Sequence, residues 1–363
     1  MARHRKIKRH TYSYRTRKRR RRNLMRALTC LLILAALILI GYSVALSLER
    51  LSEPSAPSEE SSQTETIPSE TSKEPESSVP SSEPEPEPEP EDPTVRAVLM
   101  PHDVMMDAAG RADFLENIDK ERYNTVVLPL KDQSGRIWYQ TEVSHAAVCG
   151  ALSENALDAK ALLAEIEAND LDPAAMIWSL QDDWASHAMY HTSYMYQNDP
   201  DVTWLDNSAD MGGKSWMNPY LPATQEYLCA LTSELSTLGF EEIFVFGNQY
   251  PNTGNQWGMG LGNQNGLSQA DALQNIIVSM QDAAGETTVI PAYLGDCYTE
   301  GVRPQIYTVT PNSFTHTPTA PILGSDMAVL EKVTAEKETL IPVIDEELLT
   351  SMQDLGIEQY LVR

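Results

Sequence analysis

Short and almost continuously apolar runs recur through residues 94–363, and no other feature of the chain constrains its fold more. Strands that are buried on both faces have this composition, because a sheet covered on both sides has no solvent-facing positions that would make the pattern alternate. We therefore expect the runs to be strands of one parallel sheet. They lie at 97–100, 125–130, 175–180, 242–246, 288–293, 305–309, 340–344 and 359–362.

Helical patterns lie between most of these runs, with apolar residues spaced three or four positions apart. Strands and helices that alternate over a block of this length favour an α/β fold, a (β/α)8 TIM-type barrel. No helical pattern separates the runs at 288–293 and 305–309, which leaves open a barrel that is incomplete after its fifth strand. The helical patterns lie at 111–122, 156–169, 221–238, 268–284, 327–337 and 346–355.

The N-terminal segment combines a basic stretch with an uncharged, apolar one. Residues 1–26 contain 13 of the 27 Lys and Arg residues and no acid, and residues 27–48 carry no charge. A helix of that length spans roughly 33 Å, enough for the hydrocarbon core of a bilayer, and basic flanks stay in the cytoplasm. We therefore predict a basic cytoplasmic tail, a single-pass transmembrane helix at 27–48 and a location at the cell membrane. A cleaved signal peptide and a nucleic-acid-binding tail are the alternatives.

Residues 49–95 are rich in Pro, Glu and Ser, and Glu and Pro alternate over residues 83–91. Proline removes backbone donors and repeated negative charge opposes collapse, so this composition predicts an extended, disordered linker. Both a stalk of required length and a spacer without a length requirement fit the pattern. The barrel domain, at 96–363, is then expected to be extracellular.

The charge and motifs of the C-terminal block argue against several functions. Residues 94–363 carry 38 acidic and 12 basic residues, and a domain this acidic repels the phosphates of nucleic acids. Ala188 stands where a zinc-binding helix with His187 and His191 would need a glutamate. The glycines at 258–262 do not join a strand to a helix, as a dinucleotide site requires. We expect no nucleic acid, no metal and no cofactor.

Polar and aromatic residues gather where the predicted strands end, the face at which such barrels place their sites. Carboxylates and amides hydrogen-bond sugar hydroxyls and aromatic rings cover apolar sugar faces, so the expected partner is a polysaccharide or a peptidoglycan-type glycan. For Trp216 and Trp257, packing within a lid fits the pattern as well as ligand contact does. The candidate catalytic residues are Asp103, Asp182 and Asp296, and the candidate substrate-binding residues are Lys131, Asp132, Trp216, Asn218, Tyr220, Asn248, Gln249, Tyr250 and Trp257.

Three stretches of the chain resemble a known family. The sequence NTVVLPLKDQSGRIWY at 124–139 resembles the second-strand motif of bacterial glycoside-hydrolase-like (β/α)8 barrels, formerly a domain of unknown function. SWMNPY at 215–220 and LGFEEI at 238–243 are similar to the segments that lead to that family's fourth strand. The resemblance covers most of residues 96–300. It implies a barrel that acts on a glycan or binds one.

The chain departs from this family where catalysis is expected. The family typically continues its fourth strand into Asp-Tyr-x-Arg-Phe-Pro, whereas Phe246 and Gln249 replace the aspartate and the arginine in the present chain. Pro129 and Ala292 stand where the family often carries an acid in the second and fifth strands. Glycoside hydrolysis normally needs two carboxylates. The resemblance therefore implies a divergent member of the family.

Three functions are compatible with these observations. The loss of the family's acids favours a catalytically degenerate barrel that binds cell-envelope polysaccharide without cleaving it. An active glycosidase that uses the displaced carboxylates Asp103, Asp182 or Asp296 is the main alternative. The third is a non-catalytic, protein-interaction scaffold of the cell wall.

Overall fold

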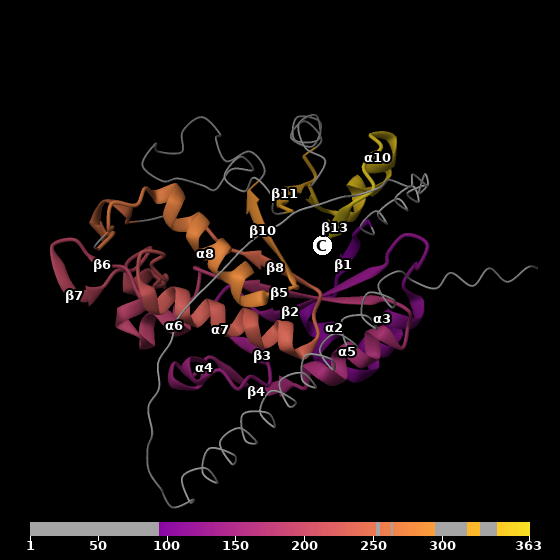
Figure 1. Cartoon of the computed structure of the whole chain (residues 1–363), viewed down its shortest axis with the longest axis horizontal. Helices are drawn as coiled ribbons and strands as arrows, with labels where there is room; N and C mark the ends of the chain where they lie inside the picture. Colours follow the sequence, from indigo (N-terminus) through magenta and orange to yellow (C-terminus); the bar gives the residue numbers. More distant parts are fainter. Residues whose placement is uncertain (1–93, 252–254, 263, 295–317, 327–339) are drawn as a thin grey trace, which may run out of the picture. The chain divides into compact units, whose positions relative to one another are not determined.

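Eight parallel strands close into a barrel in the computed structural model (Figure 1). The ring closes because β1 pairs with β13 on one side and with β2 on the other. The structure describes residues 94–251, 255–262, 264–294, 318–326 and 340–363. In ring order the strands are β1 (Arg96–Leu99), β2 (Thr125–Lys131), β5 (Asp172–Trp178), β8 (Glu242–Phe246), β10 (Thr288–Leu294), β11 (Ala320–Gly324), β12 (Val343–Ile344) and β13 (Tyr360–Val362).

The sixth strand of the ring is where the sequence prediction is wrong. That strand is β11, and the predicted run at 305–309 lies outside the described residues. Pro321 lies within β11, and a proline normally argues against a central strand because it cannot donate to the ladder. The barrel is complete after its fifth strand, since β11 pairs with β10 and with β12.

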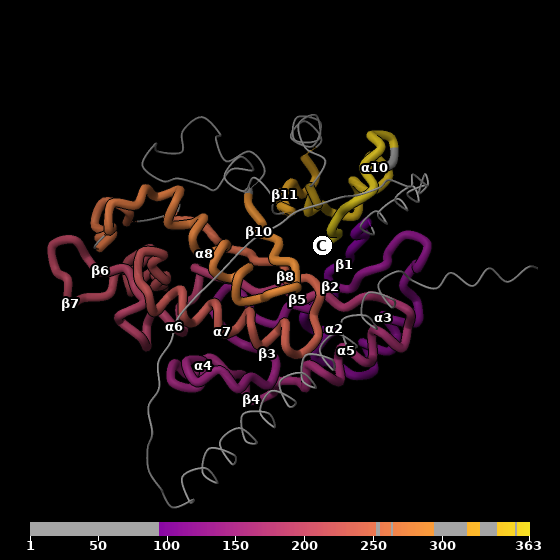
Figure 2. The backbone as a smooth tube through the Cα atoms, in the orientation of Figure 1, coloured from indigo at the N-terminus to yellow at the C-terminus, as the bar shows by residue number. Residues whose placement is uncertain are grey.

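Helices follow most strands, and α7 and α8 lie side by side along the barrel (Figures 1 and 2). α7 confirms the predicted helix at 221–238. α8 begins with a capping box in which Ser268 and Asp271 satisfy each other's backbone N–H groups. The α-helices of the described residues are α2 (His102–Met106), α3 (Ala108–Asn117), α4 (Ser144–Val148), α5 (Ala159–Glu167), α6 (Asp183–Ala188), α7 (Pro222–Leu238), α8 (Gln269–Ala284) and α10 (Leu349–Asp354).

Two further strands extend the barrel sheet, and a separate three-stranded sheet lies beside it in the fold. β3 (Ile137–Tyr139) pairs antiparallel with β2, and β4 (Leu152–Leu157) pairs with β3 outside the ring. An insert between β5 and β8 and the loop after β8 together form a small sheet with the order β7-β6-β9. The insert contains η1 (Tyr190–Thr192), β6 (Met195–Tyr196), β7 (Asp199–Thr203) and η2 (Ala209–Met211). The loop after β8 contains η3 (Gln256–Gly258) and β9 (Met259–Gly260), and η5 (Glu346–Leu348) precedes α10.

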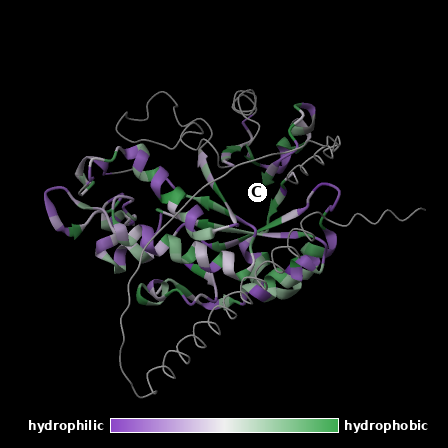
Figure 3. Ribbon diagram, viewed as in Figure 1, coloured by the Kyte–Doolittle hydropathy of each residue, from purple (hydrophilic) through white to green (hydrophobic). Residues whose placement is uncertain are grey.

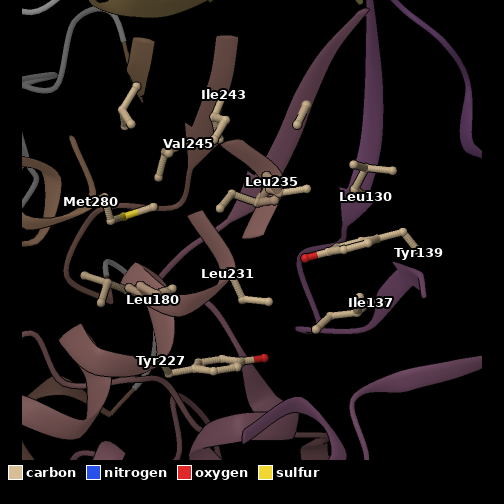
Figure 4. Packing of buried hydrophobic residues seen from close by; sticks show 14 of the residues in the cluster. Leu130, Ile137, Tyr139, Leu180, Tyr227, Leu231, Leu235, Ile243, Val245 and Met280 are labelled. Atoms are coloured by element: carbon tan, nitrogen blue, oxygen red, sulfur yellow. The ribbon is translucent and has the colours of Figure 1, made fainter. Parts of the chain in front are cut away.

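Two apolar cores hold most of the barrel together, one inside the ring and one between the ring and its helices. A third, smaller cluster packs η5 and α10 against β12 and β13. The inner core contains alternate strand residues such as Val127, Phe244 and Ile290. The outer core contains the intervening positions, and in Figure 4 Leu231 and Leu235 of α7 lie among strand residues of this core. The strands are correspondingly hydrophobic along their length in Figure 3. Burial on both faces explains why the runs read as continuous rather than alternating.

The predicted anchor and linker lie outside the described residues, as does Asp296. Thr94–Arg363 forms one compact unit by itself. Within the part of the chain that the structure describes, no helix is long and apolar enough to cross a membrane. The transmembrane helix at 27–48 and the linker at 49–95, of which the structure describes only Thr94 and Val95, therefore stay predictions.

Candidate functional site

The carboxyl ends of the eight barrel strands meet on one rim, because all eight strands are parallel. Inside the ring near this rim, the side chains come from Trp178, Phe246 and Ala292, which all belong to the inner apolar core. Trp178 lies opposite Phe246 in the register of β5 and β8, and their ring centroids are 5.7 Å apart. Phe246 and Ala292, two of the positions that the family resemblance associates with acids, are thus apolar and point into the barrel.

A buried ion pair accounts for Lys131 and Asp182. The Lys131 Nζ lies 2.9 Å from Asp182 Oδ2, and the two side chains are 1% and 0% exposed. Lys131 also donates a hydrogen bond to the carbonyl of Trp178. Asp182 Oδ1 accepts a 2.7 Å bond from the Ala185 backbone N–H at the start of α6. Neither side chain is exposed at the rim. In the interior, the charge of each side chain is compensated by that of the other.

A register shift explains why Lys131 turns away from the inside of the barrel. The pairing of β2 with β5 shifts between Pro129 and Lys131, so that Lys131 lies opposite Ile177. Ile177 belongs to the outer core. A bulge that adds one residue to a strand moves the following side chain to the other face of the sheet. The strand pattern alone places Lys131 inside, whereas the structure buries it outside the ring.

The turn after β2 is fitted closely around Asp182. Gly135 has a φ of +93°, and a Cβ atom at this position would lie 1.9 Å from Asp182 Oδ1. Only glycine adopts this conformation without strain and leaves this space. The turn that carries Asp132 is therefore held against the buried ion pair.

Asp132 positions a tryptophan at the rim. Its Oδ2 accepts a 2.9 Å hydrogen bond from Trp138 Nε1. Its Oδ1 accepts bonds of 2.8 Å and 2.7 Å from the backbone N–H and hydroxyl of Ser134, and a 3.0 Å bond from the Arg136 N–H. The indole of Trp138 in turn meets the imidazole of His102, with ring centroids 4.3 Å apart at 65°. Four hydrogen bonds occupy the carboxylate, which acts here as a support.

Other carboxylates at the rim differ in their surroundings. Asp103, the second residue of α2, is exposed directly after β1. Asp345, after β12, accepts a 2.8 Å bond from Arg363 Nε, and this guanidinium lowers the pKa of Asp345 from its usual value. Asp103 is the single candidate acid that the described structure leaves open at the rim.

Most of the predicted contact residues of the insert and of the loop after β8 are buried. Trp216 donates a 3.0 Å bond to Asp206 Oδ2, and Asn218 donates a 3.1 Å bond to the Leu261 carbonyl. Tyr250 donates a 3.2 Å bond to the Gln269 carbonyl, and burial raises the pKa of its hydroxyl. Tyr220 and Asn248 are buried as well, and Gln249 is partly exposed. Trp216 is therefore packed within the insert, as the packing alternative expected.

Trp257 is the exception among these residues, because 77% of its surface is exposed. It lies on η3, whose preceding residue Asn255 is tied to the insert by the Trp204 indole. An exposed indole on a held loop is a surface that a sugar ring can stack on.

Sequence reasoning did not single out His102 and Trp138 as site residues. His102 directly follows the end of the first strand, and Trp138 lies within the 124–139 motif, so both carried a positional signal. Their contact depends on the way the β2–β3 turn folds back towards the start of α2. Within the described residues, no group of three His, Cys, Asp or Glu side chains is arranged to hold a metal ion.

The fold is a parallel (β/α)8 barrel, and the candidate site lies at the carboxyl ends of its strands. Residues 97–291 match the model of the family called putative glycosyl hydrolase domain. The match covers more than half of the chain, and the chain belongs to this family. No curated protein sequence matches the chain significantly.

Several solved structures are similar to the chain at low sequence identity. A hypothetical protein from Ruminiclostridium thermocellum ATCC 27405 is 16% identical with a TM-score of 0.48, and the alignment covers 53% of the present chain and 96% of that protein. The GH20 exo-β-N-acetylglucosaminidase from Vibrio harveyi is 11% identical with a TM-score of 0.45, over 69% of the present chain and 41% of the enzyme. A β-N-acetylhexosaminidase is 13% identical with a TM-score of 0.46, over 71% and 56%. The chain therefore spans less than two thirds of the length of these two enzymes.

Proposed function

We propose that this family member binds a cell-envelope polysaccharide, of peptidoglycan type, at the strand-end rim of its barrel and does not hydrolyse it. The observation that carries the proposal is Phe246. Its ring packs on Trp178 inside the barrel, where the family resemblance places an aspartate. A phenylalanine neither donates a proton nor attacks an anomeric carbon, and hydrolysis normally needs two carboxylates.

The state of the other carboxylates supports the same reading. Asp182 is buried in its ion pair with Lys131, and Asp132 is occupied by four hydrogen bonds. A general acid or nucleophile must reach the substrate. His102, Trp257 and Asp103 are among the exposed residues that can meet a sugar.

The active glycosidase remains the second candidate, and the exposure of Asp103 favours it. Asp103 would act as one carboxylate, with Asp296 as its partner. A separation of about 5–10 Å between the two carboxyl groups would be required for either stereochemical outcome. This candidate makes a clear kinetic prediction that the binding proposal does not share.

The test measures binding and cleavage separately with the full-length protein in detergent. We expect retention on purified cell-wall polysaccharide and on a glycan array, with no release of reducing ends from the same polysaccharide. Release that disappears in both Asp103→Asn and Asp296→Asn would establish the glycosidase instead. Absence of binding to any glycan would reject both readings and favour a protein-interaction scaffold.

The location of the domain belongs to the same proposal. We propose that residues 27–48 anchor the chain in the cell membrane, with residues 1–26 in the cytoplasm and 96–363 outside. The support is the charge pattern, a basic flank before an uncharged apolar segment. Protease added to intact cells should remove the barrel domain and leave the basic tail protected. Protection of the barrel domain would contradict this topology.

A further inference from the structure

His102, Trp138 and Asp132 form a chain of contacts at one side of the rim. Asp132 holds the indole of Trp138 through a 2.9 Å hydrogen bond, and the indole supports the imidazole of His102 at a centroid distance of 4.3 Å. His102 is exposed, whereas Trp138 is half-buried and packs on the outer core. The exposed imidazole of His102 therefore packs against an indole whose position is held by a hydrogen bond.

The turn between β2 and β3 holds this chain of contacts in place. The Asp132 carboxylate accepts three bonds within its own turn besides that from Trp138. The turn packs against the buried Asp182 at Gly135, where a Cβ atom would not fit. A contact surface that is already ordered before binding loses little conformational entropy when a ligand arrives. The arrangement of His102, Trp138 and Asp132 is therefore more typical of a binding surface than of exposed side chains that touch by chance.

The chemistry of the surface suits a sugar hydroxyl. An imidazole offers a hydrogen-bond donor and an acceptor in one flat ring, and the adjacent indole offers an apolar face. A sugar ring presents both kinds of surface, with hydroxyls at its edge and C–H groups on its faces. His102 would contact the sugar, and Trp138 and Asp132 would position it.

The charges around the rim select against acidic sugars. Asp103 is exposed beside His102. Among the described basic side chains near the strand ends, Lys131, Lys214 and Arg363 are ion-paired with Asp182, Asp183 and Asp345. Arg136 lies over the ring of Trp184 and donates to the Gly150 carbonyl. An anionic sugar at His102 would meet the exposed negative charge of Asp103, while the Arg136 guanidinium is turned onto the ring of Trp184.

We infer that this part of the rim is a subsite for an uncharged sugar residue, with His102 as its contact residue and Trp138 and Asp132 as positioning residues. The inference rests on the proposed glycan-binding function and adds the class of sugar and the residues that recognise it.

The test compares uncharged and acidic oligosaccharides as probes. Dissociation constants of chitotetraose, cellotetraose and tetragalacturonate are measured by calorimetry with the full-length protein in detergent. We expect one of the uncharged probes to bind, and His102→Ala and Trp138→Ala to weaken that binding about tenfold or more. Trp138→Phe, which keeps an aromatic ring, should retain part of the affinity. His191→Ala is the matched control, because His191 is also exposed beside an aromatic ring but lies on η1 of the insert.

A spectroscopic measurement separates positioning from a general loss of structure. The NMR signals of the His102 imidazole and of the Trp138 indole N–H are followed without ligand in wild type and Asp132→Asn. The variant should shift both signals and weaken binding, while its thermal unfolding midpoint stays close to that of wild type. An unchanged indole signal would contradict the positioning role of Asp132.

The outcomes distinguish this inference from the function on which it rests. If wall polysaccharide binds but His102→Ala and Trp138→Ala bind it and the uncharged probe as wild type does, the subsite is refuted and the proposed function stands. Equal or tighter binding of tetragalacturonate would overturn the uncharged class. Failure of both uncharged probes to bind, when the wall polysaccharide does bind, would also refute the subsite. If wild type binds no glycan at all, the proposed function fails as well.

Discussion

At the scale of single residues, burial of charge decides what Lys131 and Asp182 do. The two charged groups lie 2.9 Å apart with almost no exposed surface. Such a pair contributes little net stability, but removing one partner leaves a charge in the interior without compensation. Their role is therefore to hold the ends of β2 and β5 together beneath the rim.

Loss of the lysine charge should consequently be severe. We expect Lys131→Met to lower the free energy of unfolding by about 3–5 kcal/mol, because Asp182 would remain charged and buried. The measurement is urea denaturation of the full-length chain. Lys214→Met is the control, since its pair with Asp183 is 61% exposed on the lysine side and should cost less than about 1 kcal/mol.

The double variant Lys131→Met with Asp182→Asn should recover part of the loss. Asparagine keeps an oxygen that can accept from the Ala185 N–H but carries no charge. A single-variant cost equal to that of the exposed control would show that the buried pair does not act as described.

At the scale of elements, the β2–β3 turn connects the buried pair to the rim. Asp132 accepts hydrogen bonds from its own turn, and Gly135 closes the turn against Asp182. The sequence motif that carries Asp132, Gly135 and Trp138 is thus one structural unit. Lys131 and Gly135 of this unit contact the buried Asp182, and Trp138 lies at the rim.

A side chain at Gly135 should break this unit. Gly135→Ala combines a left-handed backbone, which costs about 1–2 kcal/mol for other residues, with a Cβ that would lie 1.9 Å from Asp182 Oδ1. We expect a loss of more than about 3 kcal/mol in the free energy of unfolding, measured by urea denaturation. Gly212→Ala is the control, because Gly212 has a φ of +76° but open space around it. Equal losses in the two variants would mean that the close fit to Asp182 has no energetic role.

Several elements could be predicted from sequence, and the reason is local. β8 has the predicted bounds, because both of its faces are buried and the run is unbroken. α7 and α8 follow their helical patterns and end at Gly239 and Gly285. β11 was missed because Pro321 and Gly324, both common in turns, leave only Ile322 and Leu323 as adjacent aliphatic residues.

At the scale of the whole molecule, closure of the barrel joins the first strand to the last. β13 lies between β12 and β1, and at the rim Arg363 pairs with Asp345 across β12 and β13. The Arg363 guanidinium lowers the pKa of Asp345 from its usual value of 3.8. A lowered pKa in the folded state means that the pair stabilises the fold above pH 3.8 and that this contribution is lost as the pH falls through the folded pKa.

The closure pair should therefore give a small, pH-dependent effect. Arg363→Gln should lower the free energy of unfolding by less than about 1 kcal/mol at pH 7, because the pair is partly exposed and screened by solvent. The difference from wild type should shrink as the pH falls below 3.8 and through the lowered pKa of Asp345 in the folded state, where its carboxylate becomes protonated. Denaturant unfolding at a series of pH values tests this. Arg122→Gln, whose nearest carboxylate lies 3.8 Å away, is the control, and a difference that grows at acid pH would contradict the assigned sign.

The sequence by itself determined the class of fold and most of its strands and helices. The spacing of apolar residues along the chain indicates which faces of a strand or helix are buried. Runs such as 125–130 and 221–238 can therefore be assigned without knowing which elements they pack against. It also identified Phe246 as the departure from the resembled family. The anchor at 27–48 stays a prediction from the same kind of local pattern.

Only the tertiary structure decided which polar residues lie inside and which lie at the rim. Lys131 and Asp132 are neighbours in the chain, yet the register shift in β2 buries the first and leaves the second beneath Trp138. The contact of His102 with Trp138 likewise joins segments that are distant in sequence. The physical reason is that periodicity reports how each strand faces its surroundings, whereas a site depends on strand pairing, bulges and turns that bring separate segments together.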